Sequence, residues 1–112
     1  MTGLALWVRH VVKDGHEDAF DALAARTVAA IAENEPGTLV YAVHTLADQP
    51  SVRVFYELYR DRAAFEAHEA YPHTRSFLEE RPAHVESVEV DVLTVAAAHA
   101  RPVLHGDVAA SS

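Results

Sequence analysis

The stretch LVYAVHTLADQPSVRVFYELYR, residues 39–60, decides the fold of this chain. Its two halves, 39–46 and 52–60, are rich in Val, Tyr and other residues that favour extended backbone. Between them, residues 47–51 contain Asp, Gln, Pro and Ser, which are typical of a turn. Because the connection is short, we expect the two strands to form an antiparallel hairpin.

Helical patterns lie on both sides of this hairpin. Residues 17–34 carry apolar and small side chains at helical spacing, and Glu35-Pro36-Gly37-Thr38 stops the pattern. After the hairpin, Asp61 is a good N-cap for a second helix that begins near Arg62. We expect Pro72 to interrupt that helix, and a further helical piece to run to about Arg81.

Strands complete the pattern at both ends. Residues 4–12 form a β-branched and aromatic run, and residues 85–96 include valines in strict alternation. The order β-α-β-β-α-β predicts an α+β, ferredoxin-like domain, with both helices on one face of a four-stranded antiparallel sheet. Because no helix covers the other face, we expect two sheets to pair as a homodimer, a dimeric α+β barrel.

Length and composition limit the other possibilities. The 112 residues suit one domain, which we place at residues 1–96, with a tail at 97–112 that is disordered or packed on the partner subunit. The net charge of −8 disfavours nucleic acid and anionic membranes as partners. The chain has no cysteine, no apparent signal peptide and no membrane-spanning run, so we expect a cytoplasmic protein.

The segment FYELYRDRAAFEAH, residues 55–68, resembles the signature of antibiotic biosynthesis monooxygenase domains. Pro72-His73 and the turn at 35–38 are also similar to that family, and the resemblance spans roughly residues 4–96. It implies a dimeric α+β barrel with a substrate pocket between sheet and helices in each subunit. Several members of the family oxidise phenols or quinols with molecular oxygen and no cofactor, because the deprotonated substrate itself supplies the electron. Others isomerise substrates or degrade haem.

Glu57 and His68 are the candidate catalytic residues. Glu57 lies near a strand end and His68 about two turns into the next helix, so both can face the layer between them. A histidine can accept a phenolic proton near neutral pH, and a carboxylate bonded to its ring would orient it. The alternative is structural: the two side chains satisfy each other and pin the helix to the sheet.

Further residues are candidates for binding a substrate, and core packing or surface exposure is the alternative for each of them. They are Phe55, Tyr59, Phe65, Tyr71, His73 and Trp7. Phe55, Glu57 and Tyr59 share one strand face, but the sequence does not settle whether that face meets the helices. We predict no metal site, because His68 and His73 are five residues apart with Pro72 between them.

The leading functional hypothesis is a cofactor-independent monooxygenase that acts on a small aromatic phenol or a quinol. One alternative is a binding module that holds an aromatic ligand without converting it. Another is a cofactor-free isomerase, which would require an arginine in the pocket, with Arg53 and Arg75 as candidates. Haem degradation is disfavoured, because haem-degrading relatives use an asparagine on the first strand and Asn34 is the only asparagine here.

Overall fold

The computed structural model describes residues 3–101. Its elements follow the predicted order, with the second helix divided at Tyr71. In chain order they are β1 (Leu4–Val12), α1 (Glu17–Asn34), β2 (Thr38–Leu46), β3 (Gln49–Tyr59), α2 (Arg62–Ala70), α3 (Pro72–Glu80), the short 3₁₀ helix η1 (Arg81–Ala83) and β4 (Val85–Thr94). Pro72 is the first residue of α3, where its missing N–H costs nothing.

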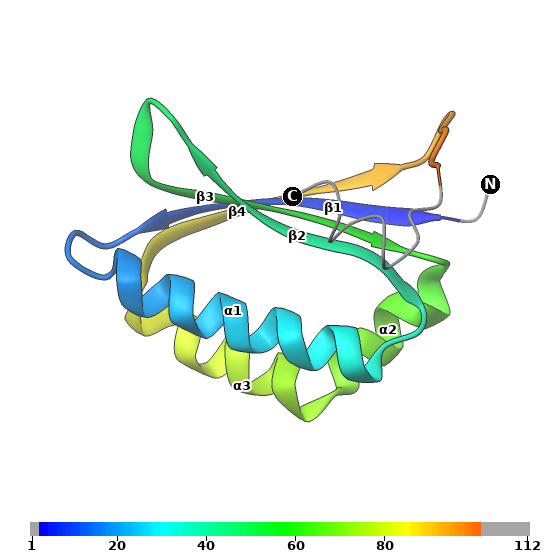
Figure 1. Ribbon diagram of the computed structural model, residues 1–112, viewed down its shortest axis with the longest axis horizontal. Helices are drawn as coiled ribbons and strands as arrows, with labels where there is room; N and C mark the ends of the chain where they lie inside the picture. The colour runs from blue at the N-terminus through cyan, green and yellow to red at the C-terminus, as the bar shows by residue number, and fades with distance from the viewer. Residues whose placement is uncertain (1–2, 102–112) are drawn as a thin grey trace, which may run out of the picture.

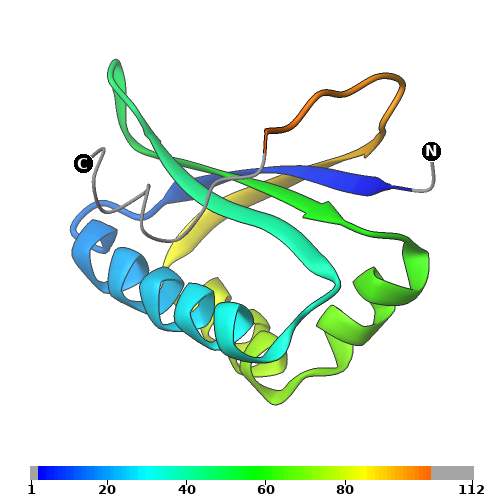
Figure 2. The same ribbon diagram turned by 45° about the vertical axis from the view of Figure 1, so that its right-hand side comes forward.

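The four strands form one antiparallel sheet in the order β2-β3-β1-β4. The three α-helices of residues 3–101 all lie along one face of this sheet, and none of them lies on the opposite face (Figure 1). The view turned by 45° shows the same two layers, with α2 at the end of the sheet where β3 terminates (Figure 2). The α+β, ferredoxin-like prediction is confirmed.

The hairpin is tighter than the sequence predicts. β3 begins at Gln49, which pairs with Leu46, so only two residues connect the strands instead of five. Pro50 is tolerated inside β3 because the pairing of β1 with β3 reaches only to Val52. β4 ends at Thr94 rather than residue 96, and the chain from 95 to 101 is irregular. The rest of the predicted tail, 102–112, lies outside the described residues.

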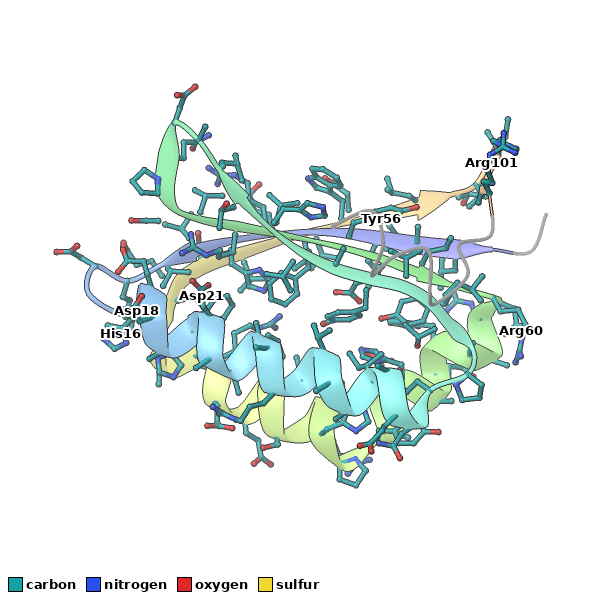
Figure 3. The ribbon with its side chains drawn as sticks, in the orientation of Figure 1. His16, Asp18, Asp21, Tyr56, Arg60 and Arg101 are labelled. Carbon is teal, nitrogen blue, oxygen red and sulfur yellow. The ribbon has the colours of Figure 1, made fainter. Side chains whose placement is uncertain are left out.

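The alternation of β3 determines what faces the helices. Phe55, Glu57 and Tyr59 point toward them and are at most 5% exposed, whereas Tyr56 and Leu58 occupy the other face. The core therefore lies between sheet and helices, and Figure 3 shows side chains filling that layer, with a second set projecting from the helix-free face.

A close contact fixes α2 beside the turn that leaves α1. Asp61 caps α2 by accepting a hydrogen bond from the Ala64 backbone N–H at 2.8 Å. The Arg60 N–H donates to the Gly37 carbonyl at 2.9 Å. A Cβ atom at Gly37 would lie 2.6 Å from the Cβ of Ala64, so only glycine permits this approach. The exit of α1 and the start of α2 are thus held side by side.

The helix-free face of the sheet presents apolar side chains to solvent. Trp7 is 44% exposed there, and Val40 and Leu93 are exposed on the same face. This matches the surface expected of a pairing sheet, although the homodimer itself stays a prediction. No helix within residues 3–101 has the length and apolar character needed to cross a membrane.

Candidate functional site

A cavity of about 290 Å³ lies between the sheet and the helices α2 and α3. Leu6 and Val8 of β1 and Phe55 of β3 form an apolar wall on the sheet side. Phe65 and Phe77 contribute aromatic rings from α2 and α3. An aromatic molecule is complementary to such walls, because it removes apolar surface from water on both of its faces. Polar and charged side chains line the cavity as well, and their placement decides its chemistry.

His68 lines the cavity and is held by a carboxylate from another element. It projects from α2 with a side chain only 6% exposed, and its Nδ1 lies 2.8 Å from Oε1 of Glu35. Thr74 Oγ1 lies 3.3 Å from the same nitrogen. Because Glu35 can only accept while ionised, Nδ1 carries the proton and donates it. Nε2 then has its lone pair available and makes no hydrogen bond to any residue in the range 3–101.

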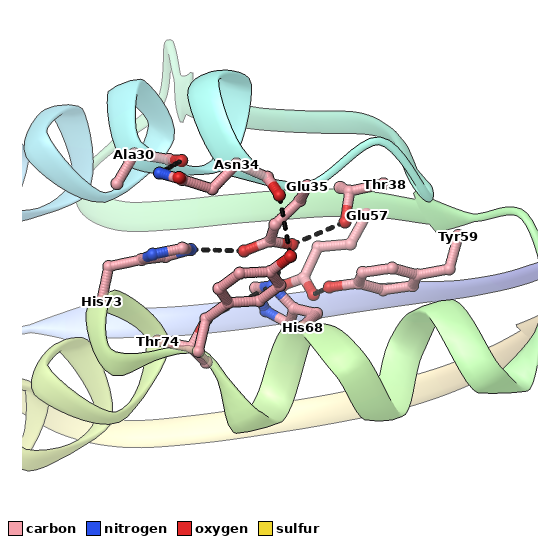
Figure 4. A network of polar contacts seen from close by, with 10 residues as sticks. Ala30, Asn34, Glu35, Thr38, Glu57, Tyr59, His68, His73 and Thr74 are labelled. Carbon is pink, nitrogen blue, oxygen red and sulfur yellow. Dashed lines mark hydrogen bonds and ion pairs between the residues drawn. The ribbon is translucent and has the colours of Figure 1, made fainter.

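Glu35 is the centre of this polar network (Figure 4). Its carboxylate accepts hydrogen bonds from the Thr38 hydroxyl at 2.7 Å and from Nε2 of His73, as well as from His68. Burial alone raises the pKa of Glu35, but the hydrogen bonds from Thr38, His73 and His68 outweigh it and hold the pKa below its usual value. Glu35 is therefore a buried anion that orients His68.

Glu57 forms a second polar group in the cavity. The Tyr59 hydroxyl donates to its Oε1 at 2.5 Å, and Tyr41, its cross-strand neighbour on β2, also bonds to the carboxyl group. Burial raises the pKa of Glu57 to about 7, with the hydrogen bonds from Tyr59 and Tyr41 and the charge of Arg81 acting against it. Glu57 is thus able to hold or release a proton near neutral pH.

The two networks adjoin through aromatic rings. The ring of His68 lies 5.2 Å from that of Tyr59 and 5.5 Å from that of Tyr41, measured between centroids. His68 and Glu57 nevertheless make no hydrogen bond with each other. The predicted pairing of Glu57 with His68 is therefore replaced: Glu35 orients His68, and Glu57 bonds to tyrosines. The catalytic roles of His68 and Glu57 remain predictions.

The other predicted binding residues divide into two groups. Phe55 and Phe65 line the cavity, and Tyr59 is fully buried behind it, packed 5.2 Å from the ring of Phe65. The remaining three lie away from it: Tyr71, whose hydroxyl donates to the Asn34 carbonyl, His73, which bonds to Glu35, and Trp7, which lies on the opposite face of the sheet. Trp7 is separated by strand parity, since it alternates with Leu6 and Val8.

The sequence analysis did not identify two charged residues of the site as functional groups. Glu35 reads only as part of a helix stop, and Arg81 as the end of a helix. The arginine that an isomerase would need is also elsewhere than predicted. Arg53 is bound to Asp21 at 2.8 Å, and Arg75 is exposed and does not line the cavity. Arg81 and Arg62 line it instead.

The described part of the chain shows no set of side chains arranged as metal ligands. No group of three or more His, Cys, Asp or Glu side chains within residues 3–101 is arranged to hold a metal ion. Glu35, His68 and His73 come together, but the carboxylate hydrogen-bonds directly to both rings.

Solved structures share this architecture. A protein from Bacteroides thetaiotaomicron, described as a candidate antibiotic biosynthesis monooxygenase, superposes with a TM-score of 0.83 at 21% identity, covering 90% of this chain and 96% of that one. PA3566 from Pseudomonas aeruginosa gives a TM-score of 0.78 at 28% identity, covering 87% and 97%. Rv0793 from Mycobacterium tuberculosis gives 0.81 at 23% identity, covering 88% and 99%. No curated protein matches the sequence.

The sequence also matches a family model directly. The model for antibiotic biosynthesis monooxygenase aligns with residues 7–80, which include the hairpin, α2 and both polar networks of the cavity. That span is well over half of the 112 residues. This chain belongs to the antibiotic biosynthesis monooxygenase family.

Proposed function

We propose that this protein is a cofactor-independent monooxygenase that oxidises an aromatic phenol or a quinol with molecular oxygen. The observation that carries the proposal is the Glu35–His68 pair, which presents an oriented imidazole to an apolar cavity. Membership of the family supports a monooxygenase in general. The aromatic substrate is inferred from the rings of Phe55, Phe65 and Phe77 that wall the cavity.

His68 begins the reaction as the base. Its Nε2 accepts the proton of the substrate hydroxyl, and the Glu35 carboxylate at 2.8 Å from Nδ1 stabilises the imidazolium that forms. The ionised substrate is electron-rich and gives electrons from a ring carbon to oxygen, so that a carbon–oxygen bond forms and a peroxide results. The oxidised species is the substrate, and the reduced one is oxygen.

Glu57 and the protonated His68 then act as proton donors to the reaction intermediate. The peroxide takes up a proton, the ring carbon loses its hydrogen, and the oxygen–oxygen bond breaks. A phenol and one molecule of oxygen thereby yield a quinone and one molecule of water. With a pKa of about 7, Glu57 is a suitable donor to the peroxide, and Tyr59 bonded to it keeps its carboxyl group in place.

Oxygen consumption tests this proposal. Purified protein is assayed against reduced quinones and polyhydroxylated aromatics, and the rate is corrected for spontaneous oxidation in buffer. We expect protein-dependent uptake that His68→Ala abolishes and Glu35→Gln lowers by at least about tenfold, since the imidazolium loses its counter-charge. Arg75→Gln, at an exposed position away from the cavity, is the matched control and retains the rate.

A kinetic comparison distinguishes a positioning role of Glu35 from a structural one. Glu35→Gln should lower kcat while KM and the circular dichroism spectrum stay close to those of the wild type, because the carboxylate acts on the imidazolium that forms during the reaction. A folded wild-type protein that consumes no oxygen with any substrate of the panel refutes the monooxygenase.

A binding module is the second candidate function. It is favoured by the fact that Glu35, Glu57 and one nitrogen of His68 are already satisfied by internal hydrogen bonds, as expected of side chains with a structural role. Aromatic ligands would then raise the melting temperature without being converted. Thermal unfolding with each ligand, followed by chromatography of the ligand for product, separates binding from turnover.

We also propose that the working form is a homodimer built on the helix-free face of the sheet. Trp7, Val40 and Leu93 give this face an apolar character that one chain leaves open to solvent within the described residues. Light scattering coupled to size-exclusion chromatography is expected to give twice the chain mass, and Trp7→Glu is expected to give the monomer. A wild-type monomer at micromolar concentration contradicts this assignment.

A further inference from the structure

Arg81 places a positive charge at the wall of the cavity. It is the first residue of η1, directly after α3, and it lines the cavity together with Glu57 and Phe77. Its guanidinium carbon lies 5.7 Å from the centroid of the Phe77 ring, so the cation packs against an aromatic face. Phe77 is itself 3% exposed, which fixes that face in position.

No carboxylate of the described residues neutralises Arg81. Within residues 3–101 none lies within 4.0 Å of its guanidinium nitrogens, whereas Arg53 and Arg26 each form an ion pair. Glu57 and Glu69 are the acidic residues that line the same cavity; neither forms an ion pair with Arg81, and the carboxyl group of Glu57 is engaged by Tyr59. The donors of Arg81 are therefore available to a molecule that enters the cavity.

The surroundings make this cation costly without a partner. Burial lowers the pKa of Arg81, and the negative charges of ionised Tyr41 and Glu57 would act in the opposite direction. Apolar walls strengthen the attraction between a cation and an incoming anion, because they exclude water that would screen it. The chain as a whole carries −8 and repels anions, so a local cation is what would admit one.

We propose that Arg81 is a specificity-determining residue that binds an anionic oxygen of the aromatic substrate. The preferred substrates are then aromatic acids, or aromatics with an ionised hydroxyl, rather than neutral rings. The planar guanidinium can form two parallel hydrogen bonds with a carboxylate and thereby fix how the ring lies toward His68. This inference rests on the proposed function for the identity of the reaction, but anion binding needs no turnover.

Equilibrium binding tests the proposal without oxygen chemistry. The probes are 2-naphthoate and its neutral amide, 2-naphthamide, which differ in charge but hardly in shape. Isothermal titration at pH 7 is expected to show that the wild-type protein prefers the carboxylate by at least about tenfold, the ratio typical of a charge-assisted hydrogen-bonded pair. Arg81→Met should remove this preference and leave the affinity for the amide within about threefold.

Two matched variants guard against a general loss of structure. Arg81→Lys keeps the charge but not the fork, so it should retain part of the preference for naphthoate. Arg75→Gln, at an exposed arginine six residues earlier in the chain, should retain all of it. Circular dichroism establishes that each variant is folded, and a misfolded Arg81→Met leaves the Lys variant to carry the comparison.

A second pair of probes identifies the source of the anionic oxygen. At pH 8.5, 4-nitrophenolate is compared with 4-nitroanisole, in which a methyl group removes the charge. An Arg81-dependent preference for either anion supports the proposal and names the source, a carboxylate or an ionised hydroxyl. The proposal is overturned if neither anion is preferred, or if Arg81→Met and Arg81→Lys keep the wild-type ratio.

The two hypotheses fail in different ways. A protein that prefers naphthoate through Arg81 but consumes no oxygen retains the anion site and loses the monooxygenase. A protein that consumes oxygen with neutral quinols and shows no Arg81-dependent preference retains the monooxygenase and loses the anion site.

Discussion

His10 is buried in the core without any hydrogen bond, and its replacement should change how stability depends on pH. It is fully buried, lies 4.3 Å from the ring of Phe55 and 5.2 Å from that of Phe20, and leaves both ring nitrogens unpaired. Burial, followed by the charge of Arg81, lowers the pKa of His10 from 6.5 to about 4, and a close backbone group of Arg53 opposes this only weakly.

The direction in which stability changes with pH follows from the lowered pKa of His10. The unfolded chain takes up a proton at His10 below pH 6.5, whereas the folded chain does so only near pH 4. Acidification through this window therefore favours unfolding. The gap corresponds to about 3 kcal/mol at the acid end, since one pH unit is about 1.4 kcal/mol. Between pH 7 and pH 5 the loss from His10 is about 2 kcal/mol.

His10→Leu removes this dependence. We expect the variant to be at least as stable as wild type at pH 7, because two unsatisfied nitrogens leave the core. Its advantage should grow by about 2 kcal/mol at pH 5. Urea unfolding followed by far-ultraviolet circular dichroism at both pH values, at one protein concentration, gives the difference between the variants. Other titrating groups cancel in that difference.

His99→Gln is the matched control, since His99 lies exposed in the irregular segment after β4. Because its side chain is exposed, its replacement should leave the free energy of unfolding at pH 7 close to that of the wild type. A His10→Leu advantage that is the same at pH 7 and pH 5 would falsify the assignment of His10 as a neutral buried imidazole.

Two further predictions concern Glu57 and Gly37. The pKa of Glu57 is raised to about 7, so its burial costs stability above that pH and not below pH 4.5. Glu57→Gln should therefore be more stable than the wild type by up to about 3 kcal/mol at pH 8 and by little at pH 4.5, as measured by urea unfolding. An equal gain at both pH values contradicts this. Gly37→Ala places a methyl group 2.6 Å from the Cβ of Ala64 and should displace α2 together with His68. We expect a loss of about 1–3 kcal/mol of stability in thermal unfolding and a lower rate of oxygen uptake. Gly15→Ala is the control: only the positive φ disfavours a side chain there, so it should lower stability without lowering the rate.

Local sequence signals were sufficient for the arrangement of elements. The central hairpin, the Pro-Gly helix stop and the break at Pro72 each have a cause within a few residues, so each could be predicted. The same holds for the Asp61 cap, since a short side chain reaches the backbone three residues on. Two boundaries were misjudged, at Gln49 and Thr94, because strand ends depend on how far the neighbouring strand continues.

The site depended on contacts between distant segments. Strand alternation groups Phe55, Glu57 and Tyr59 on one face, but only the packing of the helices decides that this face is the inner one and that Trp7 is excluded.

The carboxylate that orients His68 also lies far away in the sequence. Glu35 is 33 residues earlier, and it meets the histidine because Gly37 lets α2 approach the exit of α1. Glu57 is much nearer to His68 in sequence, but it forms its hydrogen bonds with Tyr59 and Tyr41 on its own sheet. The sequence alone determined the order of the elements and the residue types available for chemistry. Only the tertiary structure decided which carboxylate serves which base, because hydrogen bonds form between atoms brought within about 3 Å by packing, whatever their separation along the chain.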